Sequence, residues 1–380
     1  MDLTASGGSS TARVATATRA SIKPWVPASI LFAANMLWAV GATWDIQWHA
    51  DVGPDTFFTV PHLFIYASAA VAGFAALAVI LTTTAAGRAG RAVDPELGGP
   101  GIAVFGRTFT APLGYLVASL GAASFLLYGL WDLWWHSIYG FDAVIDSPPH
   151  IGLFLSSTLT SVGTVIVFAS ARRQAWGEIG ALVCLGHLLT SSTVTALAVS
   201  QLNAGTVRWT TVVTAFMTLM LLMSGAAFRR FGATIVAATA SAMQGAFWLF
   251  APWAAHAYAD AVGLPVRDNL RGIPVTPALV PLCLIPLGLV MDLLLRRARP
   301  ASRLLPTLVG GFGGAVIALC APWQTILIYG SRPLVVDAIV STAALAALFG
   351  CVGGYFGWGF GGMLRLTAPG QSAPAQEVRA

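Results

Sequence analysis

The stretch Trp44-Asp45-Ile46-Gln47-Trp48-His49 occurs a second time, slightly altered, as Trp131-Asp132-Leu133-Trp134-Trp135-His136. Each copy is followed by a glycine, an aspartate and a Pro-His pair: Gly53, Asp55, Pro61 and His62 after the first, and Gly140, Asp142, Pro149 and His150 after the second. The offset is 87 residues as far as the aspartate and 88 at the Pro-His pair. Apolar segments flank both stretches. The sequence therefore predicts two copies of one helix–loop–helix hairpin, an internal repeat of a kind common in membrane folds.

The composition around this repeat excludes a soluble protein. Of the 380 residues, 57% are hydrophobic and 9% are charged, whereas a soluble domain carries about 25% charged residues. Too few ionic side chains are available to cover a water-exposed surface. We expect an all-α polytopic integral membrane protein whose exterior is largely solvated by lipid.

Ten apolar segments are long enough to cross about 30 Å of hydrocarbon at 1.5 Å per residue. They run over 25–48, 60–84, 109–136, 148–171, 176–201, 209–227, 231–256, 275–295, 305–329 and 334–362. The sequence thus divides into a disordered tail (1–22), a duplicated four-helix unit (23–171), six further transmembrane helices (172–365) and a second disordered tail (366–380).

The charges predict the orientation in the membrane. With ten crossings, 16 of the 20 basic residues fall on the side of both termini, and nine of the 15 acidic residues fall on the other side. Because basic loops stay inside, we expect a plasma-membrane protein with both termini in the cytoplasm and the acidic clusters outside. The basic residues are scattered in short loops, which is not the clustered footprint of a nucleic-acid-binding protein.

Each hairpin brings one carboxylate and two imidazoles together. Asp45 and His49 share a helix face because they are four residues apart, and His62 opens the next segment at the same depth. Asp132, His136 and His150 repeat the pattern. Such ligands suit copper, zinc or iron, and two histidines with one carboxylate are also typical of non-haem iron oxygenases. The alternative is that these side chains only bond to each other and cap helix ends.

At these residues the sequence resembles the C-type membrane subunit of the particulate methane monooxygenase and ammonia monooxygenase family, over roughly residues 25–170. The Asp45, His49 and His62 spacing matches the Asp-x3-His-x12-His pattern of one copper site, and Asp55-Thr56-Phe57-Phe58-Thr59 resembles a run that precedes it. Asp132, His136 and His150 match the family's second site, with aspartate in place of asparagine. The last six segments have no counterpart in that subunit.

The resemblance implies a copper-dependent monooxygenase that hydroxylates a small apolar substrate with O2 near the outer leaflet. It also implies an external electron donor, and a cupredoxin-like or other membrane subunit would be a separate chain. A homo-oligomer remains open. The alternative functions are a transporter or metal-handling protein that uses the same Asp/His clusters, and a non-haem iron oxygenase. Iron and zinc are the alternative metals to copper.

Five further residues are candidates for a supporting role. Asp55 and Asp142 occupy matched loop positions and either orient a ligand imidazole or shape the turn. His187, in the middle of a span, is an additional ligand, a proton relay or a core histidine. His256 and Asp260 are four residues apart and share a helix face; they are either partners that support the metal ligands or an interfacial helix cap.

Overall fold

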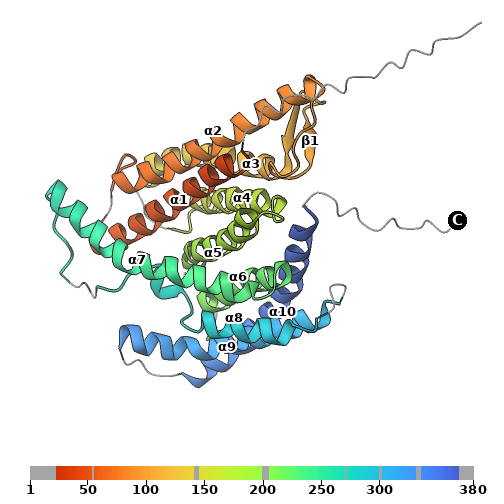
Figure 1. Ribbon diagram of the computed structural model, residues 1–380. Coiled ribbons are helices and arrows are strands. Elements are labelled where there is room, and N and C mark those ends of the chain that lie inside the picture. Colours follow the sequence, from red (N-terminus) through yellow and green to blue (C-terminus); the bar gives the residue numbers. More distant parts are fainter. Residues whose placement is uncertain are drawn as a thin grey trace, which may run out of the picture.

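The computed structural model describes residues 23–367 except 54, 141–144, 199–204, 269, 271, 299–301 and 331–334. Ten α-helices and one small hairpin make up this part of the chain (Figure 1). The helices are α1 (Trp25–Asp51), α2 (Val60–Arg88), α3 (Leu113–Tyr139), α4 (Pro148–Ser170), α5 (Ala175–Ala198), α6 (Trp209–Phe228), α7 (Gly232–Val262), α8 (Leu284–Leu295), α9 (Leu304–Tyr329) and α10 (Val336–Leu366). The predicted tails and Asp142 lie outside the described residues, apart from positions 366 and 367.

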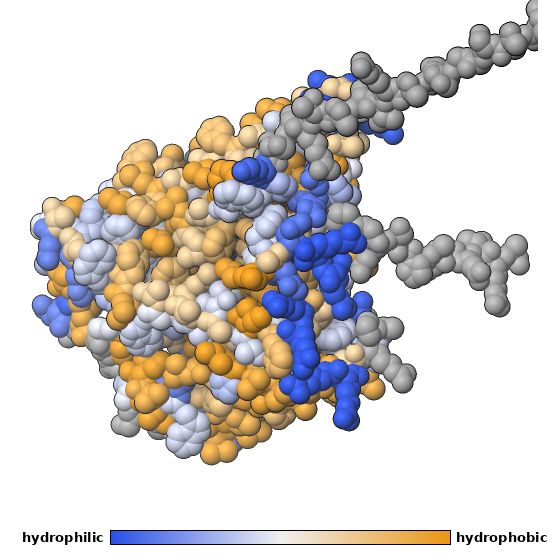
Figure 2. Space-filling model, viewed as in Figure 1, coloured by the Kyte–Doolittle hydropathy of each residue, from blue (hydrophilic) through white to orange (hydrophobic). Residues whose placement is uncertain are grey.

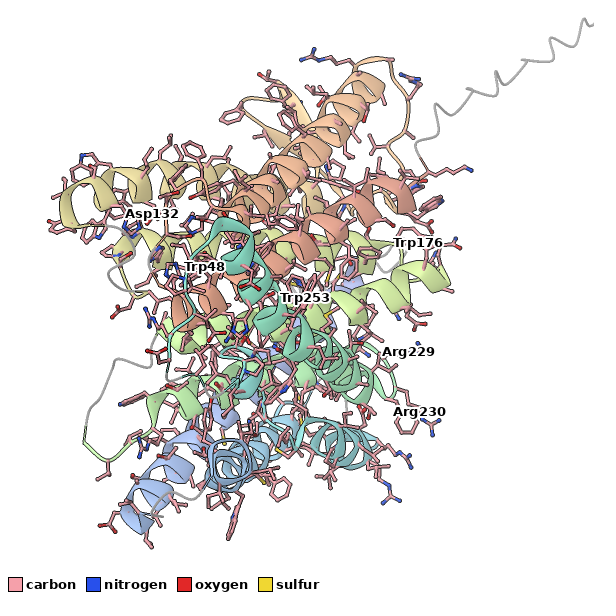
Figure 3. All side chains as sticks on the ribbon, turned by 90° about the vertical axis from the view of Figure 1, so that its left-hand side faces the viewer. Trp48, Asp132, Trp176, Arg229, Arg230 and Trp253 are labelled. Carbon is pink, nitrogen blue, oxygen red and sulfur yellow. The ribbon has the colours of Figure 1, made fainter. Side chains whose placement is uncertain are left out.

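Nine of the helices in the described part of the chain are long and apolar enough to cross a membrane. Apolar residues cover most of the surface in Figure 2, and hydrophilic side chains gather in a band at one end. Figure 3 places Asp132 and Trp48 on one side of the molecule and Arg229 and Arg230 on the other. The chain is therefore an all-α polytopic membrane protein, and its repeated acidic motifs lie far from these arginines.

The eighth predicted segment, 275–295, is not one continuous helix. Pro277 and Pro281 fall in its first half, and Pro274 directly precedes it. Proline breaks a helix because it lacks an N–H and clashes with the preceding turn. The structure has a 3-10 turn at Pro277–Leu279 and a helix α8 of only 12 residues. Such a helix spans about 18 Å, well short of the hydrocarbon thickness.

One side chain of α9 satisfies the backbone of this broken segment. Gln324 Nε2 donates to Ala278 O (2.9 Å) and Val280 O (2.8 Å), and Gln324 Oε1 accepts from Leu282 N (3.0 Å). Irregular backbone at membrane depth is stable only where protein groups replace the missing bonds. Gln324 thus explains how an unwound stretch persists among apolar helices.

The third predicted segment starts later than position 109. Residues Gly101–Val104 (β1) and Phe109–Pro112 (β2) pair as an antiparallel hairpin, with Gly101 opposite Pro112, and α3 begins only at Leu113. A glycine at position 106 with φ +62° helps the turn, because glycine adopts this conformation without steric cost. The hairpin follows α2 at the end of the molecule remote from the repeated motifs (Figure 1).

Within each repeat, the two helices pack through glycines. A Cβ atom on Gly121 of α3 would lie 2.5 Å from the backbone N of Thr160 on α4, and one on Gly41 of α1 would lie 2.9 Å from Phe64 Cβ on α2. Small residues let membrane helices approach closely. The close approach fixes how the two helices of each hairpin align along their axes. It therefore fixes the positions of the histidines near the connecting loop.

Candidate metal centres

The structure brings the repeated residues together in two groups. We call Asp45, His49, Asp55 and His62 the first centre, and Asp132, His136 and His150 the second centre. Within each group, one potential ligand atom from every residue lies within 4.8 Å of the others. Both groups could hold a metal ion, as the sequence pattern predicts.

Local sequence explains how the first hairpin presents its ligands. α1 extends to Asp51, so Asp45 and His49 lie in its last two turns. The chain then reverses through Gly53, whose φ of +152° favours glycine. Thr59 is the N-cap of α2, and Pro61 lies in the first turn, where its missing N–H costs no hydrogen bond. His62 follows directly and faces the end of α1.

The distances in the first centre are close to those between ligands of a shared cation. Asp45 Oδ1 lies 3.1 Å from His62 Nε2 and 3.8 Å from His49 Nε2, and Asp55 Oδ1 lies 3.7 Å from His49 Nε2. Ligands about 2.1 Å from a metal ion are themselves roughly 3.0–3.4 Å apart at right or tetrahedral angles. The Asp45–His62 distance falls in this range, and the other two are slightly longer. The side chains of the three residues on α1 and α2 are 12–27% exposed, while Asp55 is fully buried.

The hydrogen bonds of His62 also favour a cation here. His62 Nδ1–H donates to Thr56 O (3.1 Å). When the ring is neutral, its lone pair is then on Nε2, which faces Asp45 Oδ1. That oxygen is buried, and no described residue donates a hydrogen bond to it. A lone pair and a carboxylate oxygen repel each other unless a proton or a metal ion lies between them. An outer carbonyl that fixes the imidazole is typical of metal-binding histidines.

The second centre is built in the same way but is more enclosed. Asp132 Oδ1 lies 3.3 Å from His136 Nε2 and 3.5 Å from His150 Nε2, and the exposed fractions of the three side chains are 7%, 4% and 16%. His136 Nδ1–H donates to Gly140 O (2.8 Å), at the glycine that ends α3 with φ +92°. Ser147 caps α4 by accepting from His150 N (3.4 Å), so this histidine also opens its helix.

One cavity of about 310 Å³ connects the two centres. Asp45, His49 and His62 line it from one side, and Asp132 and His150 line it from the other. The remaining wall is mainly apolar and includes Trp38, Ile65, Phe125, Leu153, Phe154 and Val194. The sequence repeat predicts each ligand group, but it does not predict that both groups face one chamber.

The supporting candidates have different outcomes. Asp55 belongs to the first centre, and Thr59 Oγ1 donates to its Oδ2 atom and lies 3.3 Å from His62 Nδ1. Asp142 lies outside the described residues. His187 is buried, and its Nε2–H donates to Asn35 O (3.0 Å), so the structure places it as a hydrogen-bonded core histidine between α5 and α1.

His256 pairs across helices with Asp51, which sequence reasoning missed, while Asp260 on its own helix is exposed. His256 Nε2 lies 3.0 Å from Asp51 Oδ2, and Gln47 Nε2 donates to the same oxygen (2.9 Å). The backbone N of Arg267 donates to Asp51 O, and that of Val275 to Gln47 Oε1. The predicted first span ended at residue 48. A helix longer by one turn would have placed Asp51 on the same face as Gln47, which is the signal that could have identified Asp51.

Comparison of this chain with protein-family models, with curated proteins and with solved structures found no match. The two centres and their common cavity are therefore the features that indicate a function.

Proposed function

We propose that the protein is a copper-dependent membrane monooxygenase that hydroxylates a small apolar substrate with O2. The observation that carries this proposal is the shared cavity: two ligand groups of a kind that binds transition metals open into one mainly apolar chamber. Copper is the metal that the resemblance to the methane and ammonia monooxygenase subunit implies. The positive-inside pattern places both termini in the cytoplasm and the centres on the extracytoplasmic side of the plasma membrane.

In this proposal the residues of the chain have three roles: they hold the metal, orient its histidine ligands and bind the substrate. Asp45, His49 and His62, with Asp132, His136 and His150, hold the metal, which supplies the one-electron chemistry needed to use O2. Thr56 O and Gly140 O fix the ring orientation of His62 and His136. Phe125, Leu153 and neighbouring side chains bind the substrate by excluding water.

The overall reaction requires two electrons and two protons besides O2 and the substrate, and it yields the alcohol and water. The electrons would come from an external donor, and apolar substrate would enter from the lipid. A transporter of metal ions or protons would use the same centres without turnover, and a non-haem iron oxygenase would use the same ligands with another metal.

Metal analysis of the purified protein in lipid nanodiscs, joined to EPR spectroscopy, tests the proposal. We expect one to two copper ions per chain after reconstitution, and loss of both in the double variant H49A/H136A. The variant D260A is the matched control, because Asp260 is an exposed carboxylate of α7. Stoichiometric iron would favour the iron oxygenase, and the absence of any bound transition metal would contradict both.

Turnover separates an oxygenase from a transporter. With copper bound, a reductant and small alkanes or alkenes, we expect alcohols or epoxides that carry the label of 18O2. Metal or proton flux across proteoliposomes without product formation would instead identify a transporter.

A further inference from the structure

The aromatic residues around the first centre form a continuous contact on the side away from the cavity. Trp44 and Trp48 are four residues apart on α1 and share a face adjacent to the one that carries Asp45 and His49. Tyr258 of α7 contacts both indoles, with ring centroids 5.8 Å from Trp44 and 4.9 Å from Trp48. Trp44 directly precedes a ligand in the sequence, and Tyr258 lies four residues before α7 ends at Val262.

The two indoles differ from most buried tryptophans in their hydrogen bonding. The Nε1 atoms of Trp44 and Trp48 are buried, and no described residue accepts a hydrogen bond from either. Buried tryptophan N–H groups usually find a partner. An indole that loses an electron here has no hydrogen-bonded acceptor among the described residues to take its proton. We therefore expect it to stay a radical cation and to regain an electron without a proton transfer.

Tyr258 occupies the other kind of environment. Its side chain is partly exposed near the end of α7, so water can accept the phenolic proton when the ring is oxidised. The two indoles, Trp44 and Trp48, would therefore keep their protons on oxidation, whereas the phenol of Tyr258 can release its proton.

We propose that Trp44, Trp48 and Tyr258 form a relay that carries a one-electron oxidising equivalent from the first centre to the end of α7. This inference rests on the proposed oxidase function. Trp44 gives one electron to the oxidised centre and becomes a cation radical. Tyr258 then gives one electron to the indole, directly or through Trp48, and its proton to water. An external one-electron donor returns the electron, and water returns the proton.

The relay protects the ligands when no substrate occupies the cavity. His49 and His62 are oxidisable, and an oxidising equivalent that stays at the centre would attack them. The repeat offers a contrast, because Trp131, Trp134 and Tyr139 beside the second centre are 39%, 55% and 61% exposed. Tyrosines contact tryptophans here too, with ring centroids 5.9 Å apart for Tyr128 and Trp131 and 4.4 Å apart for Trp135 and Tyr139, but these contacts are made within α3 and not with a later helix.

Tyr66 is the competing acceptor. It lines the cavity, and its ring centroid lies 6.0 Å from that of His62. A radical on Tyr66 would sit in the substrate chamber instead of leaving it. The experiment must therefore distinguish Tyr258 from Tyr66.

Freeze-quench EPR of the copper-loaded full chain in nanodiscs, treated with hydrogen peroxide without substrate, tests the relay. Ring-deuterated tyrosine identifies tyrosyl signals. We expect a tyrosyl radical in the wild type, its loss in Y258F with a tryptophan cation radical in its place, and the loss of both in W44F. Peptide mass spectrometry should then find more His49 and His62 with one added oxygen atom. The matched control Y355F, on α10, should behave as the wild type.

A tyrosyl signal that survives in Y258F, or that disappears only in Y66F, would overturn the relay and leave the proposed function intact. A copper-loaded chain that gives the Tyr258 radical but hydroxylates no substrate would overturn the function and leave the relay standing. A chain that binds no metal would overturn both.

Discussion

The two hairpins repeat one sequence pattern but meet different surroundings. The first centre lies beside α7, where Asp51 binds His256 and the backbone of Arg267, and it includes a fourth residue, Asp55. The second centre has three residues in the described part of the chain, and several aromatic side chains of α3 beside it are exposed. The sequence repeat thus accounts for two ligand sets, and contacts with α7 distinguish the first set from the second.

The largest effect should follow from removing one carboxylate at a time. D132A should cost the second centre its metal and leave the first occupied, and D45A should do the reverse. Each loss should exceed the roughly 10–100-fold drop in affinity that removal of an outer partner causes. Metal titration with site-resolved EPR measures both occupancies. If either variant empties both centres, the two ions are held as one cluster and the comparison between independent centres is wrong.

The packing of the second hairpin offers the next largest effect. G121A places a methyl group 2.5 Å from the backbone N of Thr160, and backbone atoms cannot move aside as a flexible side chain can. Overpacking of this kind costs about 1–3 kcal/mol. We expect a lower Tm in nanodiscs and weaker metal binding at the second centre.

G73A is the matched control for that substitution, because its new Cβ would lie 3.6 Å from Ala122 Cβ, an ordinary contact between α2 and α3. Its Tm should stay close to that of the wild type. Equal losses of stability in G121A and G73A would show that the close contact of α3 with α4 is not what positions the second centre.

Asp55 distinguishes the centres more finely. D55N removes a negative charge 3.7 Å from His49 Nε2 and keeps the shape of the side chain. We expect metal affinity at the first centre to fall about 10–100-fold, as for other groups that support metal ligands, with the second centre unchanged. Competitive titration against a chelator of known affinity measures the change. An unchanged first centre would show that Asp55 only shapes the loop through Thr59.

The smallest effect should come from the link between α7 and α1. H256A removes one hydrogen bond to Asp51, worth about 1 kcal/mol, and Gln47 still donates to the same oxygen. A slight decrease in Tm and a small change at the first centre are expected, with none at the second. Loss of metal in H256A would instead make His256 part of the first centre.

Hydropathy predicted most of the helices, because a helix that crosses a membrane must be a long apolar segment. The ligand groups were also predictable, since a four-residue spacing and a short reversal require Asp45, His49 and His62 to converge. The predicted helix over 275–295 begins only at Leu284, because Pro277 and Pro281 outweigh the apolar composition. Gln324 and Gln47, both distant in sequence, bond to the backbone of the resulting break. The Asp51–His256 pair and the common cavity depend on how α7 and the two repeats pack, which no local pattern encodes.

The cavity that both centres share has a consequence for genetics. Its walls come from a single chain. The two ligand groups can therefore act on one substrate molecule in the cavity only when both groups are intact in the same polypeptide. If turnover needs both, co-expression of a chain disabled at one group with a chain disabled at the other should give no intragenic complementation, however well the two chains associate.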